Sequence, residues 1–232
     1  MRLAPSLVHH FLETSAALFP EKTAVIHEKS RATYSDINGW ANQLAHGLIE
    51  ADVRPGDRVG LLCENSIEYV CCYYGILKAG GVVASFNTDI KPAGLSILLK
   101  ELRPGAFIVS KKLARSSRPF DLADAGGCRL MVVGAGASRA GDYHGRSPLS
   151  DDLAARSPRD PAVAVDARSC AAIIYTSGST GAPKGVMLQH AGLVNLVEAQ
   201  LVAFDLRPEE RVYQFASYTF DASLSEIFIA LT

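Results

Sequence analysis

The sequence contains few features that would mark a metal-binding, redox, secreted or membrane protein. Its five cysteines are dispersed, and none shows the two-residue spacing typical of zinc sites and redox motifs. We therefore expect reduced, mostly buried thiols in a cytoplasmic protein. The most apolar stretch, 69–86, is interrupted by Lys78 and by glycines, so it falls short of a membrane span. A secretory signal is not expected, because His9, His10 and Glu13 lie where its apolar segment would be.

An excess of charge of one sign is also missing. The formal net charge is -1, with 20% charged and 48% hydrophobic residues, which is ordinary for a folded protein and unlike a disordered one. Basic residues are scattered, which argues against a nucleic-acid-binding module. The densest basic stretch, 111–118, is predicted to be a solvated loop. The 232 residues suffice for one large domain or two small ones.

The periodicity of apolar residues predicts alternating strands and helices. We expect a second helix capped by Ser35, with Ile37, Trp40, Leu44 and Leu48 as its apolar stripe. Strands that alternate with helices of this length indicate crossover connections and a largely parallel sheet, hence an α/β fold. The predicted strands are 24–27, 58–63, 82–86, 106–109, 130–133, 170–175 and 211–215, and the predicted helices are 7–18, 35–48, 66–78, 92–102, 191–203 and 224–231.

The pattern weakens in the middle of the chain, where Ser, Arg, Asp, Gly and Pro dominate. We interpret 111–168 as an elaborated connection between a first α/β lobe, about 1–110, and the start of a second lobe at 169–232.

The segment 176–185, TSGSTGAPKG, carries the clearest chemical signal. It follows a predicted buried strand, and its glycines permit positive φ and close approach to a ligand. Successive N–H groups in such a loop form a nest for anions, and Lys184 adds positive charge, so the segment suits nucleotide phosphates. It is not the common phosphate loop, because Gly185 rather than Ser or Thr follows the lysine. The alternative is an exposed Gly/Ser linker, but a linker rarely follows a buried strand directly and ends in Pro-Lys-Gly.

With its flanking residues, the same segment, YTSGSTGAPKGV at 175–186, resembles the adenylate-forming (AMP-binding) superfamily. The segments FPEKTAV at 19–25, TYSD at 33–36, GDRV at 56–59 and LKAGG at 77–81 fit in the expected order. FDAS at 220–223 is similar to the substrate motif of nonribosomal peptide synthetase adenylation domains. The resemblance covers nearly the whole chain. It implies a truncated form of the family's large N-terminal domain, with two lobes of largely parallel sheet flanked by helices.

The resemblance also implies a reaction. The carboxylate of an amino acid would attack the α-phosphate of ATP, accompanied by Mg²⁺, giving an aminoacyl adenylate and pyrophosphate. A thiol, from a phosphopantetheine carrier protein or CoA, would then take the acyl group. Neither nucleic acid nor a membrane is an expected partner. The residues that the resemblance assigns to the β- and γ-phosphates are Thr176, Ser177, Gly178, Ser179, Thr180, Gly181 and Lys184.

Asp221 decides among the branches of the superfamily. In amino-acid-activating members, the matching aspartate pairs with the substrate's α-ammonium group, and Ala222 and Ser225 match positions that line the substrate pocket. The alternative is that Asp221 caps the following helix. Ser223 and Glu226 form a possible capping box of their own, which favours the substrate role for Asp221.

Two departures from the pattern keep other functions open. The segment 81–88, GVVASFNT, lacks the Pro-Ile-Asp or Pro-Leu-Asp ending of peptide synthetases and is closer to acyl- and aryl-CoA ligases. The family's C-terminal domain, its catalytic lysine and its magnesium-binding glutamate are expected beyond Thr232. The 232 residues alone are therefore expected to be inactive, and a non-catalytic nucleotide-binding fragment is a third possibility.

Overall fold

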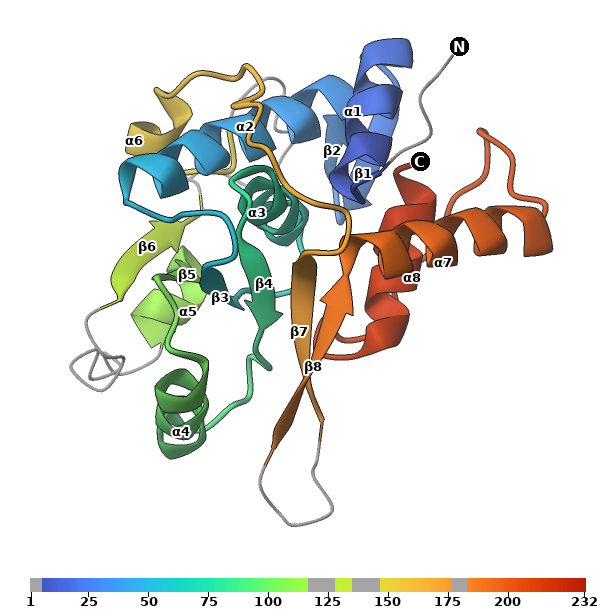
Figure 1. The fold of residues 1–232 in the computed structure, drawn as a ribbon. Coiled ribbons are helices and arrows are strands. Elements are labelled where there is room, and N and C mark those ends of the chain that lie inside the picture. Colours follow the sequence, from blue (N-terminus) through green and yellow to red (C-terminus); the bar gives the residue numbers. More distant parts are fainter. Residues whose placement is uncertain (1–5, 117–127, 135–146, 177–182) are drawn as a thin grey trace.

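The computed structural model describes residues 6–116, 128–134, 147–176 and 183–232 (Figure 1). Helices and strands alternate along most of the chain. The strands are β1 (Thr23–His27), β2 (Ser30–Thr33), β3 (Arg58–Leu62), β4 (Val82–Ser85), β5 (Ala106–Ser110), β6 (Arg129–Val133), β7 (Cys170–Thr176) and β8 (Lys184–Gln189). The helices are α1 (His9–Leu18), α2 (Tyr34–Glu50), α3 (Ile67–Lys78), α4 (Pro92–Leu102), α5 (Lys111–Ser116), α6 (Asp151–Ala154), α7 (His190–Ala203) and α8 (Asp221–Ala230).

The described strands form one six-stranded sheet and one antiparallel hairpin, β1–β2. The sheet order is β6-β5-β3-β4-β7-β8, and all neighbours are parallel except β7 and β8. The expected α/β fold with a largely parallel sheet is confirmed. Because β7 pairs with β4, the strand that leads to the glycine-rich loop continues the sheet of the first lobe. The division into lobes at 110 and 168 stays a prediction.

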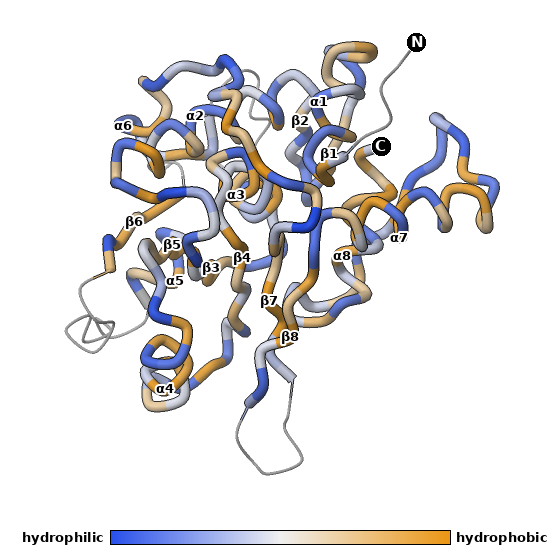
Figure 2. Tube along the Cα trace, viewed as in Figure 1, coloured by the Kyte–Doolittle hydropathy of each residue, from blue (hydrophilic) through white to orange (hydrophobic). Residues whose placement is uncertain are grey.

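Alternation along the central strands places apolar side chains on both faces of the sheet. On β5, Ala106 and Ile108 join the cluster formed with α1, α2, α3, α7 and α8, while Phe107 and Val109 face the leucines of α4. Figure 2 shows the resulting concentration of hydrophobic residues on β4 and β7 in the middle of the molecule. A sheet covered on both faces explains why these strands are continuous apolar runs in the sequence.

Helices α2 and α3 pack closely, and a glycine makes this possible. A Cβ added at Gly75 would lie 2.8 Å from Leu44 Cδ2 and 2.9 Å from the backbone oxygen of Ala41. Trp40, Tyr73 and Tyr74 are buried around this contact, as their helical spacing predicts.

Helix α1 is attached to the body of the protein through a buried group of ionisable residues. The Lys78 side chain on α3 is fully buried, and its Nζ lies 2.5 Å from Glu13 Oε1 and 4.0 Å from Asp160 Oδ2. The rings of His9 and His190 are in edge contact, with centroids 5.6 Å apart, and Nδ1 of His190 accepts a hydrogen bond from the Val8 N–H. His190 is thus part of the packed contact between α1 and α7.

Several predicted details are wrong, for local reasons. Ser35 does not cap α2; Thr33 does, in a capping box with Asp36. Residues 111–116 form α5 rather than a loop, whereas 117 and 118 lie outside the described residues. Residues 211–215 form no strand, because no described strand pairs with them. The hairpin strand β2 and the edge strand β8 were not predicted.

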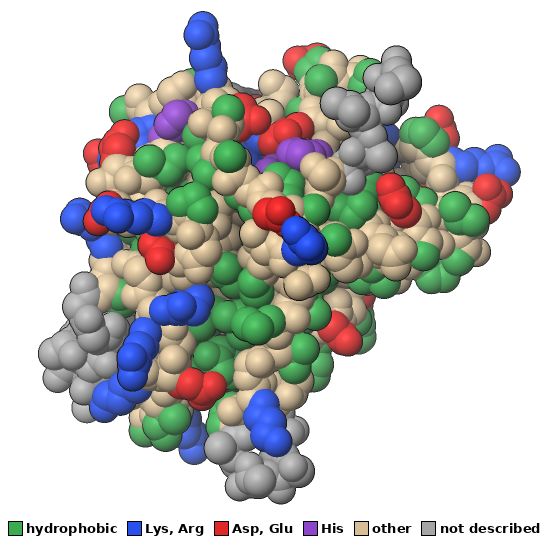
Figure 3. Space-filling view, in the orientation of Figure 1, with side chains coloured by type: hydrophobic (Ala, Val, Ile, Leu, Met, Phe, Trp, Pro, Cys, Tyr) green, Lys and Arg blue, Asp and Glu red, His purple; other side chains and the backbone are tan. Residues whose placement is uncertain are grey.

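Large apolar side chains also reach the surface. Figure 3 shows hydrophobic atoms between charged side chains on one face of the molecule. The most exposed large ones lie on α4, on β8, at the end of α7 and in the segment before α8: Ile97, Met187, Val202, Phe204, Tyr213, Phe215 and Phe220. No helix among the described residues is long and apolar enough to cross a membrane.

Candidate functional site

The two ends of the glycine-rich loop are held together by the β7–β8 hairpin. Thr176 is the last residue of β7 and pairs with Lys184, the first residue of β8, and its hydroxyl lies 3.4 Å from the Lys184 carbonyl oxygen. Both side chains are exposed. In Figure 1 these two strands extend together beyond the others. Five predicted phosphate ligands lie outside the described residues: Ser177, Gly178, Ser179, Thr180 and Gly181.

Gly185 has a different role from the one predicted. It lies within β8, its φ is not positive, and it pairs with Tyr175 across the hairpin. A Cβ at this position would lie 3.0 Å from Ile173 Cγ2. The glycine following Lys184 therefore permits close packing of the hairpin rather than a left-handed turn.

Asp221 is the first residue of α8 and is exposed. Its Oδ1 accepts a hydrogen bond of 2.8 Å from the N–H of Ala222. A carboxylate in the first helical turn is stabilised by the free N–H groups there. The N-cap position itself is Phe220, whose side chain makes no cap hydrogen bond, so the alternative that Asp221 is the N-cap is wrong.

The predicted capping box of Ser223 and Glu226 does not form. Ser223 is inside the helix, and its hydroxyl donates to the Phe220 carbonyl at 2.7 Å. The Glu226 carboxylate instead accepts hydrogen bonds from the N–H groups of Phe215 and Ala216, each at 3.0 Å. Sequence reasoning therefore assigned Glu226 to the wrong backbone donors.

The remaining predicted substrate residues lie on the first turns of the same helix. Ala222 is exposed beside Asp221. Ser225 is half-buried and donates a hydrogen bond of 2.6 Å to Oε1 of Gln200 on α7. Because residues four apart share a helix face, Asp221 and Ser225 lie on one side of α8.

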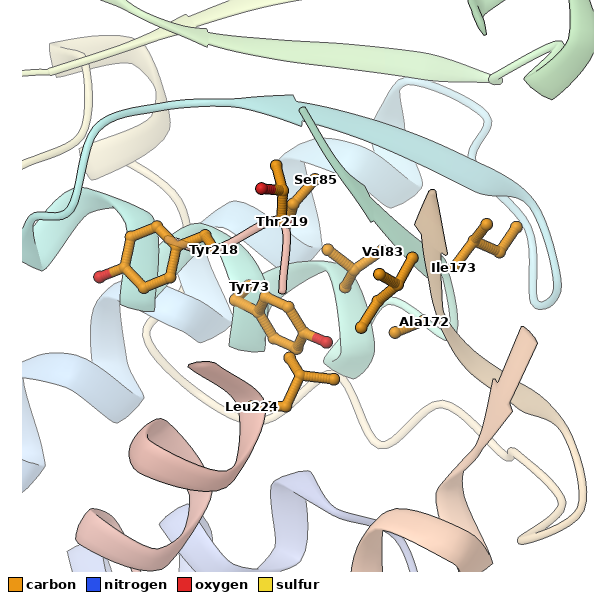
Figure 4. A pocket seen from close by; sticks show the side chains of 9 residues that line it. Tyr73, Val83, Ser85, Ala172, Ile173, Tyr218, Thr219 and Leu224 are labelled. Atoms are coloured by element: carbon orange, nitrogen blue, oxygen red, sulfur yellow. The ribbon is translucent and has the colours of Figure 1, made fainter. Parts of the chain in front are cut away.

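A small cavity connects this helix end with the sheet (Figure 4). The cavity is large enough for about one water molecule. The cavity is lined from α3, β4, β7 and the start of α8 by Tyr73, Val83, Ser85, Ala172, Ile173, Ile174, Tyr218, Thr219 and Leu224. Strand β7, which leads to the glycine-rich loop, thus meets the segment that leads to Asp221.

Aromatic side chains dominate one side of this cavity. Tyr69 stacks on Tyr218 with ring centroids 3.3 Å apart, and its hydroxyl lies 2.6 Å from Ser85 Oγ. The Tyr73 hydroxyl has no hydrogen-bond partner among the described residues. Burial raises the pKa of all three tyrosines, so they stay protonated. The helical spacing of Tyr73 predicts only a core position, and no local pattern in the sequence joins it to Tyr69 or Tyr218.

The cysteines and potential metal ligands add no further reactive group. All five cysteines are free, and burial raises the pKa of the Cys63 thiol to about 12. Within the described ranges, no group of three or more His, Cys, Asp or Glu residues could hold a metal ion.

Comparison with known proteins identifies counterparts of nearly the entire chain. A family model for AMP-binding enzymes matches residues 12–232. Tyrocidine synthase 1 of Brevibacillus parabrevis is 31% identical over 226 residues, which cover 97% of this chain and 19% of that protein.

Solved structures give the same relationship. A nonribosomal peptide synthetase, FmoA3, in its AMPPNP-bound form superimposes with a TM-score of 0.83 at 25% identity, over 99% of this chain and 22% of that one. The anthranilate CoA ligase AuaEII in complex with anthranoyl-AMP superimposes with a TM-score of 0.74 at 26% identity. The match covers 91% of this chain and 40% of that one. The chain thus spans well under two thirds of each of these proteins.

Proposed function

The chain belongs to the family of AMP-binding enzymes, the adenylate-forming ligases, and from this premise we propose that it activates the carboxylate of an amino acid. In the proposed reaction a carboxylate oxygen attacks the α-phosphorus of ATP. The new bond joins that oxygen to phosphorus, and the bond to the bridging oxygen of pyrophosphate breaks. The products are an aminoacyl adenylate and pyrophosphate, and a carrier-protein thiol then receives the acyl group.

The observation that carries this proposal is the meeting of two segments at one cavity. Strand β7 leads to the glycine-rich loop, and Thr219 and Leu224 flank the helix start that presents Asp221. An exposed carboxylate at the start of the helix that follows this segment suits a substrate that carries an ammonium group next to its carboxylate. We assign Asp221 to the α-ammonium group, and Ala222 and Ser225 to the side of the substrate pocket.

The glycine-rich loop would hold the leaving group. The residues from Thr176 to Gly181 would donate backbone and hydroxyl hydrogen bonds to the β- and γ-phosphates, and Lys184 would add positive charge. Charge on pyrophosphate grows in the transition state, so these groups contribute electrostatic stabilisation rather than proton transfer.

Magnesium belongs to the proposal only as the counterion of ATP, where it neutralises phosphate charge. The described residues offer no cluster that fits it, and we assign no residue of the chain to the metal. The acceptor thiol is proposed to be phosphopantetheine on a carrier protein, with CoA as the alternative.

The test is substrate-dependent exchange of pyrophosphate into ATP by the longest natural product of this gene. Pooled amino acids are compared with pooled fatty and aryl acids, and wild type is compared with Asp221→Ala. We expect exchange with amino acids that falls at least about a hundredfold in the variant, because the ion pair between Asp221 and the substrate is lost. Asp151→Ala is a matched control, since Asp151 is also an exposed first residue of a helix, α6.

Each outcome separates two explanations. Equal loss in both variants would mean that removing any helix-terminal carboxylate impairs the protein, and the substrate role would be wrong. Exchange only with acids that lack an amine would place the protein with acyl- or aryl-CoA ligases. Exchange by the 232 residues alone would contradict the expectation that they are inactive.

The CoA ligase is the second candidate function, and one observation favours it. The segment 81–88, GVVASFNT, lacks the Pro-Ile-Asp or Pro-Leu-Asp ending of peptide synthetases, and its Phe86-Asn87-Thr88 is closer to fatty and aryl acyl-CoA ligases. A protein that binds nucleotides without turnover is the third, and absence of exchange with every acid would support it.

A further inference from the structure

The segment between α7 and α8, residues 204–220, contains neither helix nor strand, yet it leads directly into Asp221. Beyond the first residues, whose N–H groups donate to carbonyls at the end of α7, the segment has no helix or sheet ladder to satisfy its N–H and C=O groups. Other groups must therefore satisfy them and determine the path of the chain.

Glu226 supplies the main contacts. From the second turn of α8 its carboxylate reaches back to the preceding segment and accepts hydrogen bonds from three donors. Its Oε2 lies 3.0 Å from the N–H nitrogens of both Phe215 and Ala216, and 3.3 Å from Nε2 of Gln214. Its Oε1 lies 3.3 Å from the Ala216 nitrogen. Hydrogen bonds to an ionised carboxylate are stronger than neutral ones, so this is the strongest fixed point of the segment.

Helix α3 and Asn65, two residues before it, hold the same segment from the other side. Asn65 donates to the Gln214 side-chain oxygen, and Tyr69 stacks on Tyr218. The Ala216 carbonyl accepts from the Gln214 side chain. Residues 214–218 are thus held between α3 and α8.

Only a short turn separates this fixed region from the substrate residue. The Phe220 N–H donates to the Ser217 carbonyl at 2.9 Å, and α8 begins at the next residue. We propose that Glu226 is a positioning residue: by holding the backbone at Phe215 and Ala216 it fixes Asp221 where the α-ammonium group of the substrate binds. This proposal rests on the proposed function.

The proposal distinguishes two substitutions at the same position. Glu226→Gln keeps an oxygen that accepts from the two N–H groups, whereas Glu226→Ala leaves them without that acceptor. We expect Glu226→Ala to raise the KM for the amino acid about tenfold, the effect of losing hydrogen bonds to a charged group. The KM for ATP and kcat should change less than about twofold, because the loss affects substrate placement and not the reacting phosphate.

The experiment combines two measurements. Amide hydrogen exchange in the 232-residue chain, followed by NMR, reports on Phe215, Ala216 and Ala222, and pyrophosphate exchange by the longest natural product reports KM and kcat. The variants are Glu226→Ala, Glu226→Gln and Asp221→Ala. The control is Glu198→Ala, which removes an exposed glutamate from α7.

In Glu226→Ala we expect all three amides to exchange about tenfold faster, together with the raised KM for the amino acid. In Glu226→Gln we expect the exchange rates and this KM to return toward the wild-type values. Effects in Glu226→Ala no larger than in Glu198→Ala would overturn the proposal. Equal rises in both KM values, or no recovery with glutamine, would also overturn it and leave a purely structural role. An Asp221→Ala variant with unchanged KM would instead refute the ammonium role, whatever the amides show, and with it the positioning role of Glu226.

Discussion

The histidines that join α1 to α7 should make folding stability depend strongly on mildly acidic pH. Burial, with the nearby Lys78 ammonium, lowers the pKa of His9 from 6.5 to about 2, and burial lowers that of His190 from 6.5 to about 4. Both imidazoles are almost completely inaccessible, and His9 Nδ1 has no hydrogen-bond partner among the described residues. His10, Glu13 and Asp160 are the other ionisable groups close to this cluster.

The sign follows from which state binds more protons. Above pH 6.5 both histidines are neutral in the folded and the unfolded chain, so stability is complete. As pH falls below 6.5, the unfolded chain takes up protons that the folded chain cannot, and stability is lost down to the folded pKa of each group. With these pKa shifts, each histidine lowers the free energy of unfolding by about 2 kcal/mol at pH 5, and the pair lowers it by about 4 kcal/mol.

Urea unfolding at pH 8 and pH 5 measures this loss, with the buried Trp40 as the fluorescence probe, because it is the sole tryptophan. Other groups titrate over the same range, so the informative quantity is the difference between variants. Between pH 8 and pH 5, the free energy of unfolding of His9→Leu should fall by about 2 kcal/mol less than that of wild type. His27→Leu, on the β1–β2 hairpin, tests whether removing any imidazole has this effect. A loss in His9→Leu equal to that of wild type, within the error of extrapolation, would refute the reasoning.

Two further predictions concern packing and charge in the same core. Gly75→Ala should lower the free energy of unfolding by about 1–3 kcal/mol, because the new Cβ would lie 2.8 Å from Leu44 Cδ2. Gly192→Ala, in α7 with open space around it, should instead raise the free energy of unfolding by up to about 1 kcal/mol. Thermal unfolding of both variants checks this, and equal effects would contradict it. Glu13→Gln should destabilise by about 2 kcal/mol, since it leaves the buried Lys78 ammonium poorly paired, while Lys78→Met should cost less because it removes the charge itself. A double-mutant cycle in urea measures the coupling, and a larger cost for Lys78→Met would contradict the prediction.

Elements with strong local signals were predictable from the sequence. Helix α4 has the predicted bounds, because Pro92 sets its first turn and its leucines recur at helical spacing. Helix α3 matches the predicted 66–78 closely, and Ser66 caps it by accepting from the Tyr69 N–H. Strand β8 was missed because its apolar residues are mostly exposed on an edge, so no buried run marks it. The segment 211–215 has the composition of a strand, but pairing depends on a partner that the described residues do not supply.

The candidate site was predictable only in part, because it too depends on contacts between residues distant in the sequence. The sequence predicts a helix over 224–231, whereas α8 begins three residues earlier, at Asp221. The proximity of the start of α8 to β7 through the cavity has no local signal, because that contact joins residues about 45 positions apart through the fold. The Tyr69–Tyr218 stack also depends on the sheet order and has no local signal.

Two Ser/Thr-x-x-Asp/Glu patterns of the chain, at 33–36 and 223–226, show where local rules stop. At Thr33 and Asp36 the capping box forms, because Thr33 is extended immediately before the helix and both free N–H groups lie within reach. At Ser223 and Glu226 the same spacing occurs, but the helix has already begun at Asp221, so the serine N–H donates to Phe220 instead. The glutamate is then free to accept from N–H groups ten and eleven residues earlier, in a segment without its own ladder. The pattern predicted that a carboxylate satisfies backbone donors; the start of the helix determined which donors these are.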